Sequence, residues 1–328
     1  MSFNQFTNLD FDDLKSQIKD YLRTNSNFTD FDFEGSNFSV LIDILAYNSY
    51  ITAFNTNMSV NESFLDSATL RENVVSLARN IGYVPRSKRA AKAKVSFTVD
   101  TAGFLDVRSV TLKAGVVALG AMASGSYIFS VPEDITVPVD VNGVGTFSNI
   151  DILEGTYLTK NFTMDDSQPN QRFVIPNSDV DSTSIRTFIS DLTNEEYTLY
   201  SNILNIDNTS KIFLIQEVED EKYELVFGDN VFGKKPNTGS SIFVSYIITN
   251  GKDGNGVSNF TFSGIIEDNN QNRITTGISR ISTIQSSENG DDIEKIDSIK
   301  YLAPRVYSSQ YRAVTANDYK GLIPTIFP

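Results

Sequence analysis

The chain has 328 residues, enough for about two domains, and its 40% hydrophobic and 21% charged content is ordinary for a globular protein. It contains no Cys and no His, which excludes disulfides, thiolate chemistry, imidazole metal ligands and the commonest general base. The formal net charge of −14 disfavours binding to nucleic acid, because neutralising phosphates requires a basic surface.

Residues 1–88 are predicted to form a helical segment that serves assembly. Asp10 can cap a first helix, and a second helix is expected to open near Ser36 or Asn37. The second helix carries apolar residues on nearly every side, so it must be buried on all sides. Three short helices can hardly provide that cover, and we expect other chains to contribute. The residues expected at this interface are Leu41, Leu45, Phe54, Leu70, Val74 and Leu77.

A third helix in this segment has recognisable end signals. Thr69 and Glu72 have the spacing of a capping box, Gly82 stands where a left-handed C-terminal cap belongs, and Pro85 follows. No segment predicts a membrane span, because the longest apolar-rich stretch, 38–54, is too short and too polar. The N-terminus lacks the pattern of a signal peptide, so we expect the protein to be made in a cytoplasm.

The next region, residues 89–264, shows many short alternating segments separated by turn residues, which predicts an antiparallel β-sandwich or barrel-like domain. Residues 265–328 are predicted to be a connector and the beginning of a further α/β domain. A helix is expected to start near Asp291 or Asp292 and to end at Pro304, and a capping-box pattern at 315–318 predicts another helix. The predicted fold class is therefore α+β.

The segment Gly228–Lys234 fits the G-x-x-x-x-G-K skeleton of a phosphate-binding loop, but two features argue against nucleotide binding. Lys235 occupies the position of the Ser or Thr that would hold Mg²⁺, and Pro236 prevents a helix from starting there. The flanking residues alternate as strands do. We therefore predict a turn between two strands, with no cofactor.

Charged clusters offer only general interpretations. The basic run Arg86–Lys94 is expected to be a solvated connector, with docking of an acidic partner or of another copy of this chain as the alternative. The pairs at 165–166 and 195–196 are interpreted as loop residues rather than as a glycosidase carboxylate pair.

Three segments resemble motifs of one protein family. FGDNVFGKKPNTG, with the strand that follows it, is similar to a motif of the baseplate-J-like proteins of contractile phage tails. Residues 41–85 are similar to the N-terminal helices of T-even-like baseplate wedge proteins within that superfamily, and APRVYSSQYRAVTANDYKGL resembles a third motif. Asn230 replaces a Gly of the family pattern, and Asn tolerates positive φ. The structural motif residues that the resemblance assigns are Phe227, Gly228, Asp229, Gly233, Arg312, Asp318 and Tyr319.

The resemblance implies a structural baseplate wedge subunit in the virion, assembled in the host cytoplasm. It would build the ring around the tail tube through further copies of itself and other wedge or hub proteins, and relay the change that triggers sheath contraction. It implies no enzyme activity, no direct nucleic acid, no membrane and no small-molecule substrate. In the family a further α/β domain follows, so we expect this chain to be the N-terminal part of a longer protein. A receptor- or polysaccharide-binding tail adhesin remains the alternative, suggested by the β-rich middle.

Overall fold

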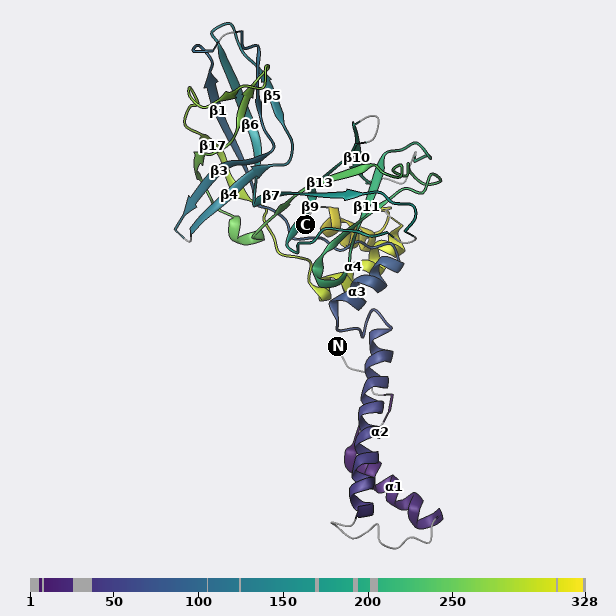
Figure 1. Cartoon of the computed structure of the whole chain (residues 1–328). Helices are drawn as coiled ribbons and strands as arrows, with labels where there is room; N and C mark the ends of the chain where they lie inside the picture. The colour runs from purple at the N-terminus through teal and green to yellow at the C-terminus, as the bar shows by residue number, and fades with distance from the viewer. Residues whose placement is uncertain are drawn as a thin grey trace. The chain divides into compact units, whose positions relative to one another are not determined.

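The computed structural model describes residues 6–7, 9–25, 37–104, 106–123, 125–168, 171–190, 194–200, 206–310 and 312–326. The chain divides into two compact units, one formed by Met1–Tyr83 with Ile296–Pro328 and the other by Val84–Lys295. Helices make up the first unit, and antiparallel, barrel-like sheets dominate the second (Figure 1). The predicted α+β class with N-terminal helices is confirmed.

Five α-helices are described in the first unit. They are α1 (Phe11–Asn25), α2 (Asn37–Glu62), α3 (Arg71–Asn80), α4 (Ile296–Ser309) and α5 (Ala316–Ile326). As predicted, Asp10 caps α1, because its Oδ1 accepts the backbone N–H groups of Asp12 at 2.9 Å and Asp13 at 3.1 Å. Helix α3 ends in a Schellman motif, in which Gly82 has a φ of 81° and the N–H of Tyr83 donates to the carbonyl of Ala78.

The predicted bounds of α4 are wrong at both ends. The helix begins at Ile296 rather than at Asp291 or Asp292, because the preceding residues pair as extended chain with the segment before β1, where the N–H of Glu294 donates to the carbonyl of Arg86. Pro304 lies inside the helix and does not end it. The apolar face of α4, which packs against α3 in a shared core, offsets the hydrogen bond that the proline removes.

The boundary expected after residue 264 also differs from the structure. Strands β15–β17, which follow it, belong to the second unit, and the division falls between Lys295 and Ile296. The C-terminal helices α4 and α5 cluster with the N-terminal helices instead of standing apart. Local sequence patterns could not show this, because α3 and α4 are brought together by tertiary packing.

Two sheets of the second unit enclose one core. The six-stranded sheet has the order β14 (Asn259–Phe262), β3 (Gly115–Met122), β4 (Gly125–Val131), β6 (Val144–Glu154), β1 (Lys92–Asp100) and β17 (Ser282–Glu288). The four-stranded sheet has the order β16 (Arg273–Ile274), β15 (Ile266–Asp268), β2 (Ser109–Leu112) and β5 (Ile135–Pro138). The N–H of Ser287 on β17 donates to the carbonyl of Val257 beside β14 at 2.9 Å, so the first sheet is nearly closed on itself.

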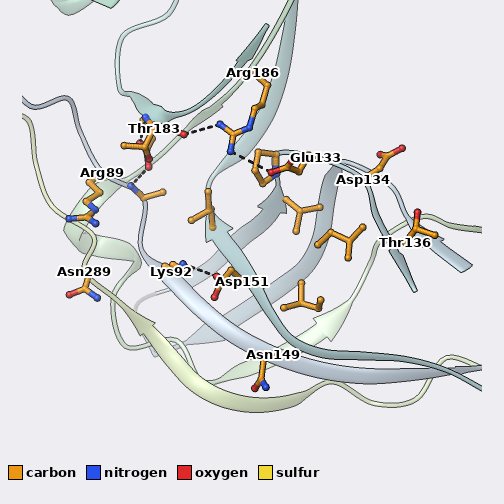
Figure 2. Close-up of a pocket in the computed structure, with 17 residues that line it drawn as sticks. Arg89, Lys92, Glu133, Asp134, Thr136, Asn149, Asp151, Thr183, Arg186 and Asn289 are labelled. Atoms are coloured by element: carbon orange, nitrogen blue, oxygen red, sulfur yellow. Dashed lines mark hydrogen bonds and ion pairs between the residues drawn. The ribbon is translucent and has the colours of Figure 1, made fainter. Parts of the chain in front are cut away.

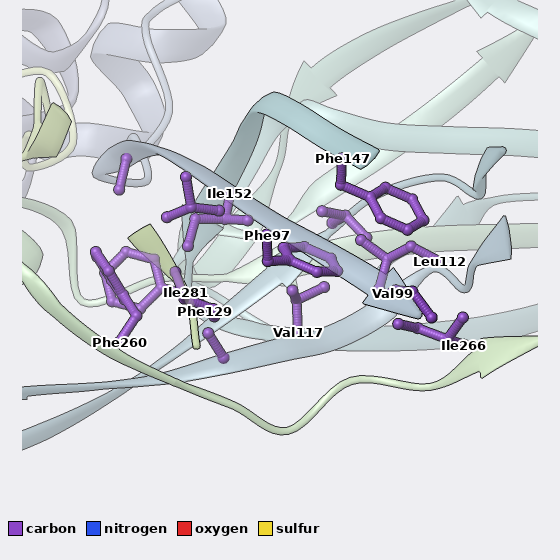
Figure 3. Close-up of a cluster of buried hydrophobic side chains, with 14 of the residues drawn as sticks. Phe97, Val99, Leu112, Val117, Phe129, Phe147, Ile152, Phe260, Ile266 and Ile281 are labelled. Carbon is purple, nitrogen blue, oxygen red and sulfur yellow. The ribbon is translucent and has the colours of Figure 1, made fainter. Parts of the chain in front are cut away.

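The enclosed core is aromatic and aliphatic (Figure 3). The rings of Phe97 and Phe147 stack with centroids 4.7 Å apart, and Phe129 meets Phe260 edge-on at 4.9 Å. These side chains come from alternating positions on paired strands, which is the pattern that predicted this region to be β.

A seven-stranded sheet holds the second core of this unit. Its order is β7 (Thr156–Thr163), β13 (Ser241–Ile248), β9 (Val180–Ser190), β10 (Asn194–Leu199), β11 (Ile212–Glu217), β12 (Tyr223–Phe227) and β8 (Phe173–Val174). The pair β10–β11 is parallel, and the other pairs are antiparallel. Strands β12 and β13, on either side of the predicted turn, are not neighbours in the sheet. The turn between them therefore does not form a simple hairpin.

Candidate assembly surfaces

Helix α2 leaves most of its large apolar side chains exposed. They include Leu41 and Leu45, each 53% exposed, and Phe54, 45% exposed, all three of which were predicted interface residues. Covering such side chains is the main favourable term in protein association. The described part of the chain does not cover them.

The exposed residues also have a regular spacing. Five of them, together with the half-buried Met58, repeat at alternating intervals of four and three residues, which is the heptad spacing of a helix that packs along another helix. We call this row the α2 seam, and it consists of Val40, Ile44, Tyr47, Ile51, Phe54 and Met58. The sequence prediction identified only Phe54 of this row, although the spacing itself was visible in the sequence.

A different face of α2 receives α1 (Figure 1). That face carries mostly small or polar residues together with the buried Ile42, with Ala46 fully buried and Ala53 half-buried. Lys15 on α1 forms an ion pair with Asp43 at 2.5 Å. The buried amide of Asn57 fixes the chain before α1, since its oxygen accepts the N–H groups of Phe6 and Thr7 at 2.9 and 3.0 Å. Thus α1 packs on the small-residue face and leaves the seam free.

The three candidates predicted on and before α3 have different environments. Leu70 is 53% exposed, whereas Val74 is completely buried and Leu77 is partly buried. Val74 and Leu77 belong to the core that α3 forms with α4. For these two residues the structure shows a contact within the chain, so only Leu70 keeps a surface that another chain could cover.

The capping box predicted for α3 is wrong. Thr69 makes no side-chain cap to the helix, and Glu72 makes no described contact there. The carboxylate of Glu62, at the end of α2, instead accepts the N–H of Thr69 at 2.7 Å and that of Leu70 at 3.2 Å. It also accepts the side-chain amide of Asn73 at 2.9 Å. Glu62 therefore joins the end of α2 to the start of α3.

The FGDN loop, defined as Phe227–Lys235, is held by its own side chains and by close backbone packing. Asp229 Oδ1 accepts the N–H groups of Phe232 at 2.8 Å and Val231 at 2.9 Å, and these bonds lower the pKa of the Asp229 carboxyl. Asn230 adopts a φ of 68°, so Asn does take the positive-φ position that the family pattern gives to Gly.

The two glycines of this loop pack against each other. A Cβ on Gly228 would lie 2.3 Å from the carbonyl carbon of Gly233, closer than real Cβ atoms approach. Phe227, just before them, contributes its ring to the second core, with its centroid 5.4 Å from that of Phe173. Lys234 Nζ lies 2.6 Å from Glu195 Oε2, so this lysine is ion-paired with strand β10. Glu195 therefore lies in a strand, contrary to the loop prediction.

The C-terminal motif forms the predicted capping box. Asp318 Oδ2 accepts the N–H groups of Thr315 at 2.7 Å and Val314 at 3.1 Å, and these bonds lower the pKa of Asp318. Tyr319 is 49% exposed on α5. Arg312 is exposed and donates to the side chain of Gln310. The structure thus assigns Asp318 a local structural role and leaves Arg312 and Tyr319 at the surface.

The basic run Arg86–Lys94 is not a solvated connector. Arg86 forms an ion pair with Asp291 at 2.6 Å, and Lys88 forms one with Asp179, just before β9, at 3.1 Å. The run enters strand β1 and its alanines are buried, so it joins the two β cores of the second unit.

Within the described ranges, no group of three or more acidic side chains is arranged to hold a metal ion. Among the helices of those ranges, none is long and apolar enough to cross a membrane. What the described residues do offer is the exposed apolar surface of α2.

Residues 10–83 match a family model described as the helical domain of gp6-like baseplate wedge proteins. The helical region of this chain is therefore similar to that of phage tail baseplate wedge proteins. The chain is 29% identical over 336 residues to baseplate wedge protein gp6 of Enterobacteria phage T4. That alignment covers 97% of this chain and 50% of the relative, so the chain spans about half the length of the curated protein that it matches. The resemblance seen in the three sequence motifs is confirmed.

A solved structure is also similar, the six-fold symmetrised cryo-EM structure of the anti-feeding prophage (AFP) baseplate. The match covers 99% of this chain and 65% of that chain at 13% identity, with a TM-score of 0.31. A likeness this weak establishes neither the fold nor the function.

Proposed function

We propose that this chain is a structural subunit of a contractile-tail baseplate wedge, joined to further copies of itself and to other wedge or hub proteins through helix α2. The observation that carries the proposal is the α2 seam, a heptad row of large apolar side chains that the chain itself leaves open. The matches to baseplate wedge proteins support the same role.

The exposed apolar side chains of α2 would contribute favourably to association. Burying one large apolar side chain completely contributes about 1.5–3 kcal/mol. Tyr47 is 60% exposed, Ile44 is 59% exposed, and Phe54 is 45% exposed, so roughly half of each contribution is still available to a partner, or about 1 kcal/mol per residue. Leu41 and Leu45 extend the apolar surface beyond the seam, which would allow a third helix to join a bundle.

Two single substitutions test the interface. Leu45→Asp, beside the seam, and Phe54→Asp, within it, each place a charge that a partner helix would have to bury. We expect both variants to lose co-purification with companion wedge subunits while hydrogen exchange of the β unit stays unchanged. Ile284→Asp is a matched control, because Ile284 on β17 is 55% exposed but lies outside the helical unit. Normal capture of wedge subunits by both α2 variants would contradict the proposal.

The wider role follows from the proposed assembly. As a wedge subunit in the virion, assembled in the host cytoplasm, the chain would contribute to the ring around the tail tube and relay the change that triggers sheath contraction. Its function would be mechanical rather than catalytic, which is consistent with a sequence that lacks His and Cys. Cryo-EM of extended and contracted particles would test the relay. We expect the contacts of this chain to differ between the two states, and identical contacts in both would contradict a relay.

A further inference from the structure

The wall of the first β core contains a gap between strands β6 and β5. Strand β4 pairs with β6 only at Phe129↔Glu154 and Ser130↔Leu153. Strand β5, which follows β4 in the chain, has no ladder with β6, and the residue after it, Val139, forms an isolated bridge with Gly145. Between these two points, residues 146–152 of β6 pair with β1 on one side and with no described strand on the other. Residues 131–138, which face this open edge, form no ladder with β6.

A cleft of about 670 Å³ lies at this gap. Figure 2 shows aliphatic side chains in its middle and charged or amide side chains around them. The aliphatic floor includes Val131, Ile135 and Ile150. The volume lies in the range of about 300–1,000 Å³ that is usual for ligand sites. An unpaired strand edge beside an apolar floor is the arrangement to which an extended peptide adds as a further strand.

Each carboxylate that lines the cleft already has an ion-pair or hydrogen-bond partner within the chain. Asp151 pairs with Lys92 at 2.7 Å, and Glu133 lies 3.5 Å from Arg186. Of the remaining two lining carboxylates, one is ion-paired and the other accepts backbone N–H groups; they are Asp134 and Asp181.

Among the charged side chains that line the cleft, Arg89 differs from the others. It lines the cleft, is partly exposed, and its guanidinium has no ion-pair partner among the residues that the structure describes (Figure 2). An incoming carboxylate would gain Arg89 without breaking an existing pair. An incoming cation would find each carboxylate of the cleft already bound.

We infer that this cleft is a second docking site, which binds an extended, acidic segment of a partner protein by β-strand addition to β6. The partner's aliphatic side chains cover the floor, and its carboxylate binds Arg89. That the partner belongs to a baseplate rests on the proposed function, whereas the binding chemistry depends only on the cleft. This site lies in the second unit and is formed by residues other than those of the α2 seam.

The test uses the purified full chain and a defined probe, an eight-residue peptide of alternating valine and threonine with one central glutamate. A matched peptide carries lysine in place of the glutamate. We expect saturable binding of the glutamate peptide in fluorescence anisotropy, about tenfold tighter than that of the lysine peptide, as one charge-assisted bond provides. Amide exchange at 146–151 should slow only when peptide is bound.

Two variants decide whether Arg89 sets the preference. Arg89→Glu should reverse the order of the two peptides, whereas Arg273→Glu, an exposed arginine of β16 with no described ion pair, should leave the order unchanged. Equal affinity for both peptides, or protection only at another strand edge, would overturn the inference. Self-association that Arg89→Glu abolishes and the peptide does not inhibit would identify a second copy as the occupant and would also overturn it. Because the purified chain is tested without wedge proteins, these results are independent of the α2 experiments.

Discussion

Replacing Glu62 with Gln tests how the helical unit is held together. The Glu62 carboxylate accepts the hydroxyl of Thr69 at 2.6 Å as well as two backbone N–H groups and the amide of Asn73. Glutamine keeps one acceptor oxygen, but it lacks the negative charge and the second acceptor oxygen of glutamate. Glu72→Gln is the matched control, because Glu72 is the residue that the sequence pattern assigned to this cap and it makes no such contact.

The expected loss can be worked from these bonds. An N-terminal cap contributes about 0.5–2 kcal/mol, and a hydrogen bond to a charged group about 1.5–3 kcal/mol. Since Glu62 is partly exposed and glutamine retains one acceptor, we expect a loss of about 1.5 kcal/mol. That free energy corresponds to roughly tenfold faster exchange of the α3 amides if they exchange through opening of this cap.

The pH dependence gives a second test of Glu62. Burial raises the pKa of its carboxyl, but the bonds from Thr69, Asn73 and Leu70 together outweigh burial and leave the pKa below its ordinary value of 4.5. The contribution to stability is therefore fully present above pH 4.5 and is lost as the pH falls through the lower folded pKa. Glu62→Gln should remove this dependence.

Hydrogen exchange with mass spectrometry over Arg71–Asn80 measures both effects. Glu62→Gln should accelerate exchange there and leave strand β13 unchanged, while Glu72→Gln should match the parent chain. If Glu72→Gln accelerates exchange as much as Glu62→Gln, or if neither does, the assignment of the cap to Glu62 is refuted.

Two further substitutions test the motif segments. Gly228→Ala should destabilise the FGDN loop by about 1–3 kcal/mol, as overpacking does, because the new Cβ would meet Gly233. Thermal unfolding should show a lower midpoint for this variant, and an unchanged midpoint would contradict the prediction. Gly103→Ala is the control, because a Cβ there meets no atom within 4 Å. Asp318→Asn should speed amide exchange in α5. The contribution of Asp318 is present above its ordinary pKa of 3.8 and lost as the pH falls through the lower folded value, so an unchanged exchange rate at neutral pH would refute the capping box it forms with Thr315.

Local signals in the sequence predicted local structure well. The Asp10 cap, the Gly82 end of α3 and the box at Thr315–Asp318 depend only on neighbouring residues, and all three are confirmed. The Thr69–Glu72 box failed because a competing acceptor from another helix, Glu62, bound the Thr69 N–H that Glu72 was expected to bind. Pro304 was misread for a similar reason, since packing on α3 outweighs the local cost of proline.

At the candidate interface, too, the sequence predicted the local pattern but not the tertiary contacts. The apolar circumference of α2 predicted that its surface needs cover, and the structure leaves Leu41, Leu45 and Phe54 exposed. The spacing of Val74 and Leu77 predicted an apolar face but could not say what covers it, and α4 from the other end of the chain does. Periodicity identifies a face to be buried, whereas its partner depends on the tertiary fold.

Accessibility of the α2 seam in the assembled particle tests the central claim most directly. The chain has no native cysteine, so Ile51→Cys introduces a single thiol into the seam, and Val141→Cys introduces one into a fully exposed turn of the β unit. Both variants should react rapidly with a maleimide reagent as free chains. In assembled baseplates the seam thiol should be protected at least tenfold relative to the free chain, by burial against partner helices. Equal reactivity of the Ile51→Cys thiol before and after assembly would contradict the claim that other chains cover α2.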